Sequence, residues 1–467
     1  MLEFGLQFML PILLVRWLDA AAFADYRLAW LAIGTAMAVA PFALPRSLFY
    51  FLPRMPLAER SPYVHQAFFL LVASGLCAGA LMGPWNPLLP ENFRQLTSGE
   101  WFLPAFLTLW VAASLIELLP NAEGHVHAQA RIIAILAVMR TAGVALGALS
   151  GRVEVVFASL LVFALVKFAL VFQHIGRGYG WQLGAISRNT LSSQLAYVLP
   201  FGLASALFLL RGQADQWVAA ALFSPADFAA FSIGAVVMPV VSLVRTSVNN
   251  AITPRLSALE SSNDQAGMLR LNQRANTASG FVLLPLLTLT AVLAEHLVTL
   301  VYTSRYALAA DVMRINSLAL LGVAVEVSTL TIVLNQGRFL LVVDLLLLLA
   351  GVLASYCGAL VFGMPGAALG NVLTLGAGNA ISFWRVSRLM GVPMRQLQQW
   401  RVLLRILLAA LVAGSLAWLV NRAHLIQNIF AEACLMTIVF GCAYLVMLHI
   451  VGLMRIALEL LRGSPNL

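Results

Sequence analysis

The sequence has little charge and no long polar stretch. Only 10% of its 467 residues are Asp, Glu, Lys or Arg, whereas 61% are hydrophobic and the mean hydropathy is +0.91. The longest polar stretches, 176–189 and 257–276, are too short to fold as separate domains. This composition excludes a soluble globular protein and indicates a chain that crosses a membrane many times.

Lysine is almost absent, since Lys167 is the only one. A P-loop requires Gly-Lys-Ser/Thr, so the chain hydrolyses no nucleotide by that route, and we expect a gradient or a partner to drive any transport. The four cysteines lie in apolar runs, which predicts packing and not a disulfide framework. Glu123, His125 and His127 resemble metal ligands in spacing, but they lie in a short turn with no further ligand. We therefore predict no metal site and no cofactor.

Apolar runs long enough to cross a hydrocarbon core of about 30 Å are frequent. The first residues, MLEFGLQFML, lack a basic region and a cleavage site, and predict a first span and not a signal peptide. The expected fold class is an all-α polytopic membrane protein with about fourteen transmembrane helices. The candidate spans are roughly 2–18, 28–52, 63–84, 101–120, 130–150, 154–174, 191–211, 226–248, 278–302, 313–334, 339–362, 366–387, 402–421 and 428–453. Prolines inside these runs predict kinks at Pro41, Pro45, Pro200, Pro239 and Pro285.

Two parts of the sequence repeat. RWLDAAAFADYRLAWLAIG matches AALFSPADFAAFSIGA, which aligns Phe23 with Phe228 at an offset of 205 residues. A second match aligns Arg131 with Arg338 at an offset of 207 residues. Six spans fit in one repeat, and an even number keeps both copies in the same orientation, so we predict two parallel lobes of six helices. The expected parts are 1–189, 190–390 and a final pair of spans in 391–467.

The arginines are distributed unevenly between the two sides of the expected membrane. If the N-terminus is cytoplasmic, seventeen arginines fall in inner loops and the C-terminal tail, and eight fall on the outer side. This bias follows the positive-inside rule. The net charge of +9 therefore reflects topology and contact with anionic membrane lipids, and we expect no nucleic-acid partner.

Several segments carry a family resemblance. LLVRWLDAAAFADYRLAW followed by SLFYFLPR resembles the opening of the polysaccharide-transport flippases of the multidrug/oligosaccharidyl-lipid/polysaccharide (MOP) superfamily. LFSPADFAAFSIGA looks closer still, and NQGRFLL with MPGAALGNVLTLG is similar to the later spans of that family. The sequence begins a few residues into the usual first span, and Ala24 replaces the glycine that follows the motif phenylalanine.

The resemblance implies a transporter and not an enzyme. Its expected cargo is an undecaprenyl-pyrophosphate-linked oligosaccharide, a repeat unit of O-antigen or exopolysaccharide, which would cross the bacterial inner membrane by alternating access. Polysaccharide polymerase and export machinery are the implied protein partners.

A pyrophosphate that crosses hydrocarbon needs cations in a water-accessible cavity, and the planar fork of arginine bonds phosphate oxygens in pairs. An arginine that faced lipid at mid-depth would cost roughly 2.5–3.5 kcal/mol. We predict a cationic substrate-binding cavity lined by Arg245, Arg46, Arg16 and Arg211. Alternatively, Arg16 and Arg211 snorkel at outer ends, Arg46 anchors an inner end, and Arg211 pairs with Asp215 one helical turn later.

Acidic residues inside spans are candidates for ion coupling. Glu326 lies near the middle of its expected span, whereas Glu117 and Asp344 lie near inner ends. Glu326 could bind a proton or sodium ion, or could only balance a cavity arginine. Arg140 and Lys167 could form a second cationic spot in the first lobe.

Three other functions stay open. A drug/cation antiporter of the same superfamily would favour an acidic cavity, and the excess of arginine argues against it. Lipid II is a second candidate cargo for a flippase. A membrane glycosyltransferase or polymerase could use Asp19 and Asp25 as its acids, but such enzymes usually have long periplasmic loops, and the longest here, 83–100, has eighteen residues.

Overall fold

The computed structural model describes residues 2–94, 101–181, 187–423 and 426–461, and these residues contain helices and no strands. Contacts divide the chain into two compact units, Met1–Ala229 and Ala230–Leu467. Eleven described helices are long and apolar enough to cross a membrane. The all-α polytopic fold class is thereby confirmed, while the count of fourteen spans and the lobe limits 1–189, 190–390 and 391–467 stay predictions.

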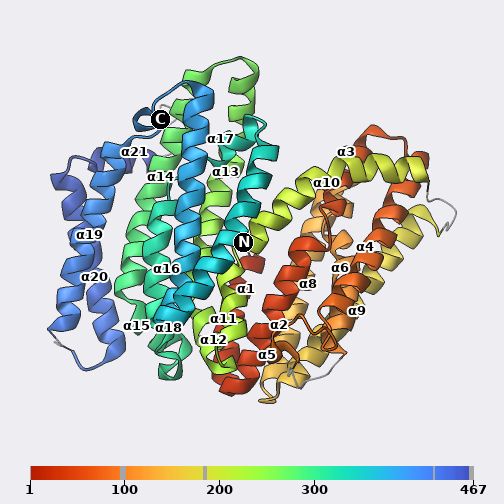
Figure 1. The fold of residues 1–467 in the computed structure, drawn as a ribbon, viewed down its shortest axis with the longest axis horizontal. Coiled ribbons are helices and arrows are strands. Elements are labelled where there is room, and N and C mark those ends of the chain that lie inside the picture. Colours follow the sequence, from red (N-terminus) through yellow and green to blue (C-terminus); the bar gives the residue numbers. More distant parts are fainter. Residues whose placement is uncertain (1, 95–100, 182–186, 424–425, 462–467) are drawn as a thin grey trace. The chain divides into compact units, whose positions relative to one another are not determined.

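The first unit is a bundle in which α4 packs along α6, α8 along α9, and α1 against α8 (Figure 1). A side chain on Gly75 would meet the backbone of Thr108, and one on Gly79 would meet the backbone of Pro104, so these glycines let α4 approach α6 closely.

The helices of the first unit are α1 Leu2–Trp17, α2 Ala20–Val39, α3 Leu44–Phe51, α4 Ser61–Leu81, α5 Glu91–Arg94, α6 Phe102–Ala113, α7 Leu119–Ala122, α8 Val126–Ala148, α9 Val153–Tyr179, α10 Arg188–Arg211 and α11 Ala214–Leu222. It also has the 3-10 turns η1 Leu52–Arg54, η2 Leu57–Glu59 and η3 Ser114–Glu117.

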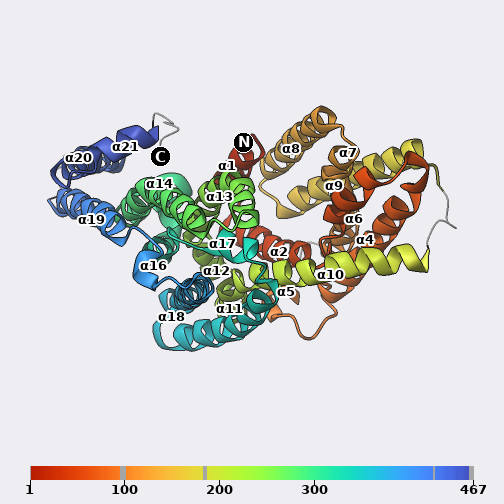
Figure 2. The same ribbon diagram turned by 90° about the horizontal axis from the view of Figure 1, so that it is seen from above.

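In the second unit, α14 packs against α13, α16 and α19, and α19 pairs with α20 (Figure 2). Helix α12 begins in the first unit and ends in the second. The elements are α12 Pro225–Gly234, α13 Val237–Ser261, α14 Gln265–Val292, α15 Ala294–Leu297, the π-turn η5 Val298–Tyr302, the 3-10 turn η6 Ser304–Tyr306, α16 Ala309–Val323, α17 Ser328–Val333, α18 Gly337–Met390, the 3-10 turn η7 Met394–Gln396, α19 Trp400–Arg422, α20 Ile429–Ile450 and α21 Met454–Leu461.

Helix α18 is a hairpin and not one straight rod. Its 54 residues would extend about 81 Å at 1.5 Å per residue. The backbone leaves the helical conformation at Gly363, with φ 65° and ψ −145°. A Cβ atom on Gly358 would lie 2.2 Å from the carbonyl oxygen of Gly366, and one on Gly370 would lie 2.2 Å from the backbone nitrogen of Ser355. The two halves therefore pack antiparallel and match the expected spans 339–362 and 366–387.

The repeat is visible in both units. Helix α2 begins after Asp19, whose carboxylate accepts a hydrogen bond from the Ala22 backbone, and α12 begins after Ser224, whose hydroxyl accepts one from the Asp227 backbone. The aligned residues Phe23 and Phe228 are both fully buried. Each helix then breaks, after Val39 in the first unit and after Gly234 in the second.

The expected kink at Pro41 is a complete break, because Phe42 and Ala43 have positive φ angles and α3 begins only at Leu44. The cysteines were predicted to have a packing role and no disulfide framework, and in the structure all are free thiols. All four are exposed on helix surfaces, where an apolar thiol can face lipid: Cys77, Cys357, Cys434 and Cys442.

Candidate functional site

Arg245 forms the centre of a buried polar cluster in the second unit. It lies on α13, and its side chain is 9% exposed. Its Nη2 lies 2.7 Å from Glu326 Oε1, and its Nη1 donates hydrogen bonds to Asn276 Oδ1 at 3.0 Å and to the Ala324 carbonyl at 3.3 Å. The geometry is that of a charged pair supported by neutral hydrogen bonds, which is how a membrane interior tolerates both charges.

Glu326 reaches Arg245 because the chain is not helical there. The expected span 313–334 ends as α16 at Val323, and α17 begins only at Ser328. Asn276 Nδ2 donates to the Glu326 carbonyl at 2.7 Å, and Asn249 Nδ2 donates to Glu326 Oε1 at 2.7 Å. An unwound segment in a membrane needs such partners for its backbone.

A third asparagine, Asn379 on α18, completes this support. Its Nδ2 donates to the carbonyls of Gly322 and Val325 at 2.9 and 2.8 Å. Sequence reasoning selected Arg245 and Glu326 but missed the asparagines that hold the break. The sequence feature that could have identified them is an asparagine within an apolar helix, because its amide side chain needs a hydrogen-bond partner there.

The first unit contains a comparable break that holds Glu117. Helix α6 ends at Ala113, η3 carries Glu117, and α7 begins at Leu119. Lys167 Nζ on α9 lies 2.5 Å from Glu117 Oε1 and 4.3 Å from the centre of the Trp110 ring. Glu117 and Glu326 differ by 209 residues, close to the repeat offsets of 205 and 207, so each unit has a broken span near a carboxylate at a comparable position.

Arg140 and Lys167 were expected to form one cationic spot, but only Lys167 has an ion-pair partner among the described residues. Arg140 lies on α8 and is 8% exposed. Its Nε is buried without a hydrogen-bond partner among the described residues, and no described carboxylate is in ion-pair contact with it. A buried cation without a counter-ion is the arrangement that an anionic ligand would stabilise.

The other predicted cavity arginines lie in the first unit. Arg16 on α1 and Arg46 on α3 are exposed, and Arg211 at the end of α10 is buried, with its guanidinium 5.4 Å from the Phe208 ring. Helix α10 ends at Arg211, so Arg211 and Asp215 do not lie on one continuous helix as expected. Asp344 is buried in the first half of α18. Whether these arginines line one cavity, and whether Asp344 couples ions, remain predictions.

The residues that resembled metal ligands form a different cluster. Glu123 is hydrogen-bonded to His174 Nε2 at 2.9 Å and to the Tyr179 hydroxyl at 2.7 Å, and His125 Nδ1 lies 3.7 Å from it. Burial alone would raise the pKa of Glu123, but the hydrogen bonds from His174 and Tyr179 and the charges of the two histidines hold it below the usual value. The described residues contain no group of side chains able to hold a metal ion.

A multi-pass helical fold with broken spans and intramembrane ion pairs is typical of membrane transporters. Three solved structures share the fold. The lipid II flippase MurJ in an inward closed conformation has a TM-score of 0.70 at 12% identity, covering 96% of this chain and 98% of that one. An inward-facing multidrug resistance MATE family transporter of the MOP superfamily has a TM-score of 0.64 at 13% identity, covering 83% and 94%. A mutant MATE transporter from Vibrio cholerae has a TM-score of 0.54 at 13% identity, covering 83% and 92%.

The family model described as "Polysaccharide biosynthesis protein" matches residues 58–311. The chain therefore belongs to this family. No curated protein matches the sequence. The matched range includes Arg245 and the asparagines Asn249 and Asn276, which belong to the buried cluster.

Proposed function

We propose that this protein is a flippase that moves undecaprenyl-pyrophosphate-linked oligosaccharide repeat units across the bacterial inner membrane. Membership of the polysaccharide biosynthesis family and the fold shared with a lipid II flippase support a lipid-linked cargo. The observation that carries the proposal is Arg245, a buried intramembrane guanidinium held beside a carboxylate at a helix break. Polysaccharide polymerase and export machinery would then receive the cargo.

Arg245 suits a pyrophosphate because its planar fork can donate two parallel hydrogen bonds to phosphate oxygens. In the structure Glu326 and Asn276 occupy this fork. A cargo pyrophosphate must therefore compete with the Glu326 carboxylate. Protonation of Glu326 would remove the charge attraction and free the guanidinium, which would couple cargo binding to a proton.

The same competition offers a route to alternating access. The Glu326 segment joins α16 to α17, and its backbone is held by Asn276 and Asn379. When Arg245 leaves Glu326, one of the contacts that fix this break is lost. We propose that the two lobes then rock around the cargo, with Arg46, Arg16 and Arg211 as further contacts for its phosphates and with Asp344 and Glu117 as secondary ion sites.

The alternative functions fit these observations less well. A drug/cation antiporter binds positively charged cargo, which Arg245 would repel. An enzyme that used Asp19 would need its carboxylate, but Asp19 caps the start of α2. Lipid II also carries a pyrophosphate, so it remains the second candidate cargo, and its test is direct competition.

The proposal is tested by measuring cargo flipping in proteoliposomes with Arg245→Ala and Arg245→Lys variants. We expect flipping without ATP, a strong loss in the Ala variant and an intermediate loss in the Lys variant, because lysine keeps the charge but loses the paired donors. In cells, undecaprenyl-linked repeat units should accumulate on the cytoplasmic leaflet while surface polysaccharide declines.

Arg401→Ala, at the exposed start of α19, serves as a matched control that should flip normally. Normal surface polysaccharide in a deletion strain without a redundant flippase would disprove the proposed function. Normal flipping by a well-expressed Arg245→Ala protein would disprove only the role of Arg245.

A further inference from the structure

A cavity of about 580 Å³ opens in the first unit, near the end of α9 that carries Tyr179. Its wall comes from η2, η3, the turn before α8, α8 itself and α9. It belongs entirely to the first unit and shares no residue with the Arg245 cluster.

Two arginines, Arg60 and Arg177, bring two positive charges to this cavity, against one negative charge from Glu123. Arg60 uses its Nε to donate a hydrogen bond to the Met55 carbonyl at 3.0 Å, which directs the side chain and leaves the charge in place. Arg177 is exposed on the last turns of α9. No described carboxylate is in ion-pair contact with either guanidinium, although both line the cavity.

The cavity contains one carboxylate, Glu123, and its oxygens already have partners. His174 and the Tyr179 hydroxyl hydrogen-bond to it, and His125 lies beside it. These contacts fix the carboxylate between α9 and the turn before α8. Glu123 therefore acts within its own cluster and leaves the two arginines available to an anion.

The remaining wall is aliphatic and is supplied by Leu57, Ile116, Ile132 and Leu170. Leu57 is 76% exposed, so the apolar wall continues to the surface of the unit. A site with two guanidinium groups beside aliphatic side chains is complementary to an amphiphile with an anionic head. A free phosphate would use the arginines but not the aliphatic wall.

We propose that this cavity binds an anionic phospholipid of the cytoplasmic leaflet, with its phosphate between Arg60 and Arg177 and an acyl chain along the aliphatic wall. The loops at this end of the unit are those that the arginine bias assigns to the cytoplasm, where anionic lipids are enriched. Basic pockets between transmembrane helices on this side bind phospholipid headgroups by the same chemistry. The site does not depend on the cargo that the protein transports.

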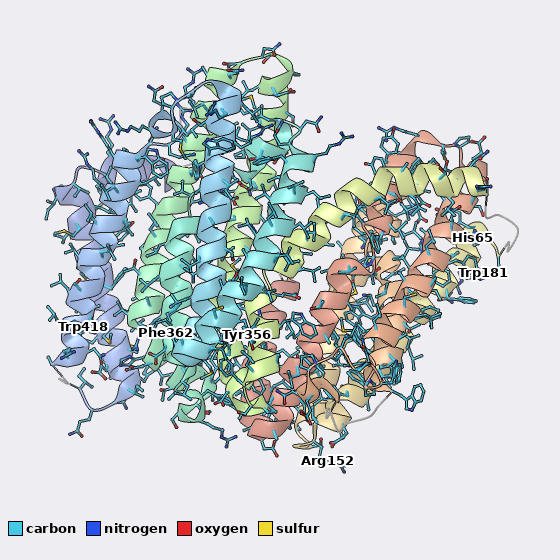
Figure 3. All side chains as sticks on the ribbon, viewed as in Figure 1. His65, Arg152, Trp181, Tyr356, Phe362 and Trp418 are labelled. Carbon is cyan, nitrogen blue, oxygen red and sulfur yellow. The ribbon has the colours of Figure 1, made fainter. Side chains whose placement is uncertain are left out.

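The test uses the full chain in nanodiscs that contain phosphatidylglycerol and phosphatidylcholine, and native mass spectrometry counts the lipids that stay bound after release. We expect wild-type protein to retain phosphatidylglycerol in preference to phosphatidylcholine. Arg177→Gln and Arg60→Gln should each reduce the retained phosphatidylglycerol about fivefold. Arg152→Gln should not, because Arg152 lies at the opposite end of α9, and Figure 3 shows it at the far end of the first unit from Trp181, which follows the cavity residues.

Four results would overturn the proposal. Equal retention of the two lipids would show that the headgroup charge is not recognised. Equal retention by the Arg177→Gln and Arg152→Gln proteins would exclude the cavity. Full displacement of phosphatidylglycerol by inorganic phosphate would identify a free-anion site, and displacement only by undecaprenyl pyrophosphate would identify an entry site for cargo. Thermal unfolding of each variant checks that the protein is folded, and among the described residues the Arg177 side chain makes no hydrogen bond that its replacement would remove.

Discussion

The buried charged residues of this protein are its candidates for a role in transport, and they differ in whether a carboxylate lies beside them. Arg245 and Lys167 each face a carboxylate, Glu326 and Glu117 respectively. Arg140 is as buried as Arg245 but has no such partner among the described residues. Since an uncompensated buried charge is costly, these residues should respond differently to removal of their charge.

The Arg245 and Glu326 pair should show strong coupling in stability. Removing one partner of a buried pair leaves the other unpaired and costs about 3–5 kcal/mol. We expect Arg245→Gln and Glu326→Gln each to lower the midpoint of thermal unfolding, whereas the double variant recovers most of the loss without recovering transport. The exposed pair Arg152 and Glu154, 3.6 Å apart, is the control and should show little coupling. Additive effects at Arg245 and Glu326 would mean that the pair does not form.

Replacing Arg140 should not destabilise the protein. Arg140→Met removes a buried charge and deprives no described carboxylate of a partner, so the unfolding midpoint should stay the same or rise. Lys167→Met is the comparison and should lower the midpoint, because Glu117 then loses its counter-ion. If transport falls in stable Arg140→Met protein, Arg140 contacts the cargo. A midpoint lowered as far as in Lys167→Met would show instead that Arg140 has a structural role.

At the level of elements, the breaks in the helices matter more than the helices themselves. The chain leaves α-helical geometry after Ala113, after Val323 and at Gly363, and the first two breaks each place a carboxylate among donors. The third break reverses the chain and turns one 54-residue stretch into two packed helices. Breaks of this kind fix where side chains point and offer hinges for a transport cycle.

The hairpin in α18 should depend on Gly363. Its φ of 65° with ψ of −145° is a conformation that only glycine adopts readily, so Gly363→Ala should cost about 1–3 kcal/mol. Gly376→Ala in the same element is the control, since a Cβ there meets no atom within 4 Å and alanine favours a helix. The stability of both variants is measured as their resistance to a protease that cleaves the unfolded protein. Equal protease resistance of the two would show that the turn does not need glycine.

For the whole molecule, orientation in the membrane follows from the distribution of arginine between the loops. Seventeen arginines fall on the side predicted to be cytoplasmic and eight on the other. Because the four native cysteines are exposed on helix surfaces, serine replacements there should leave the packing intact and provide a background for labelling.

Cysteines placed at the two ends of α19 test this orientation. Arg395 precedes the helix, Arg422 ends it, and both are exposed. In whole cells, a membrane-impermeant thiol reagent should label Arg422→Cys and not Arg395→Cys. Both substitutions replace an exposed arginine by cysteine, so a difference in labelling shows that the two positions lie on opposite sides of the membrane. The reverse pattern would overturn the predicted orientation.

The sequence by itself determined the fold class and predicted the parallel repeat and the candidate charges. Apolar runs of span length can satisfy their backbone in a membrane only as helices, so the fold class follows from composition and length. The repeat aligned Phe23 with Phe228, and both are buried. Arg245 and Glu326 stood out because charge inside an apolar run is costly.

Only the tertiary structure decided which charges meet. Arg245 and Glu326 are 81 residues apart, and their contact depends on the end of α16 at Val323, which Gly322 alone does not predict because glycines also lie inside the other helices. Lys167 pairs with Glu117, whereas Arg140 is in ion-pair contact with no carboxylate of the described residues, and their positions in the sequence did not distinguish them. Helix periodicity fixes neighbours within one turn, whereas pairs between helices depend on how the helices pack, and that is a property of the folded chain.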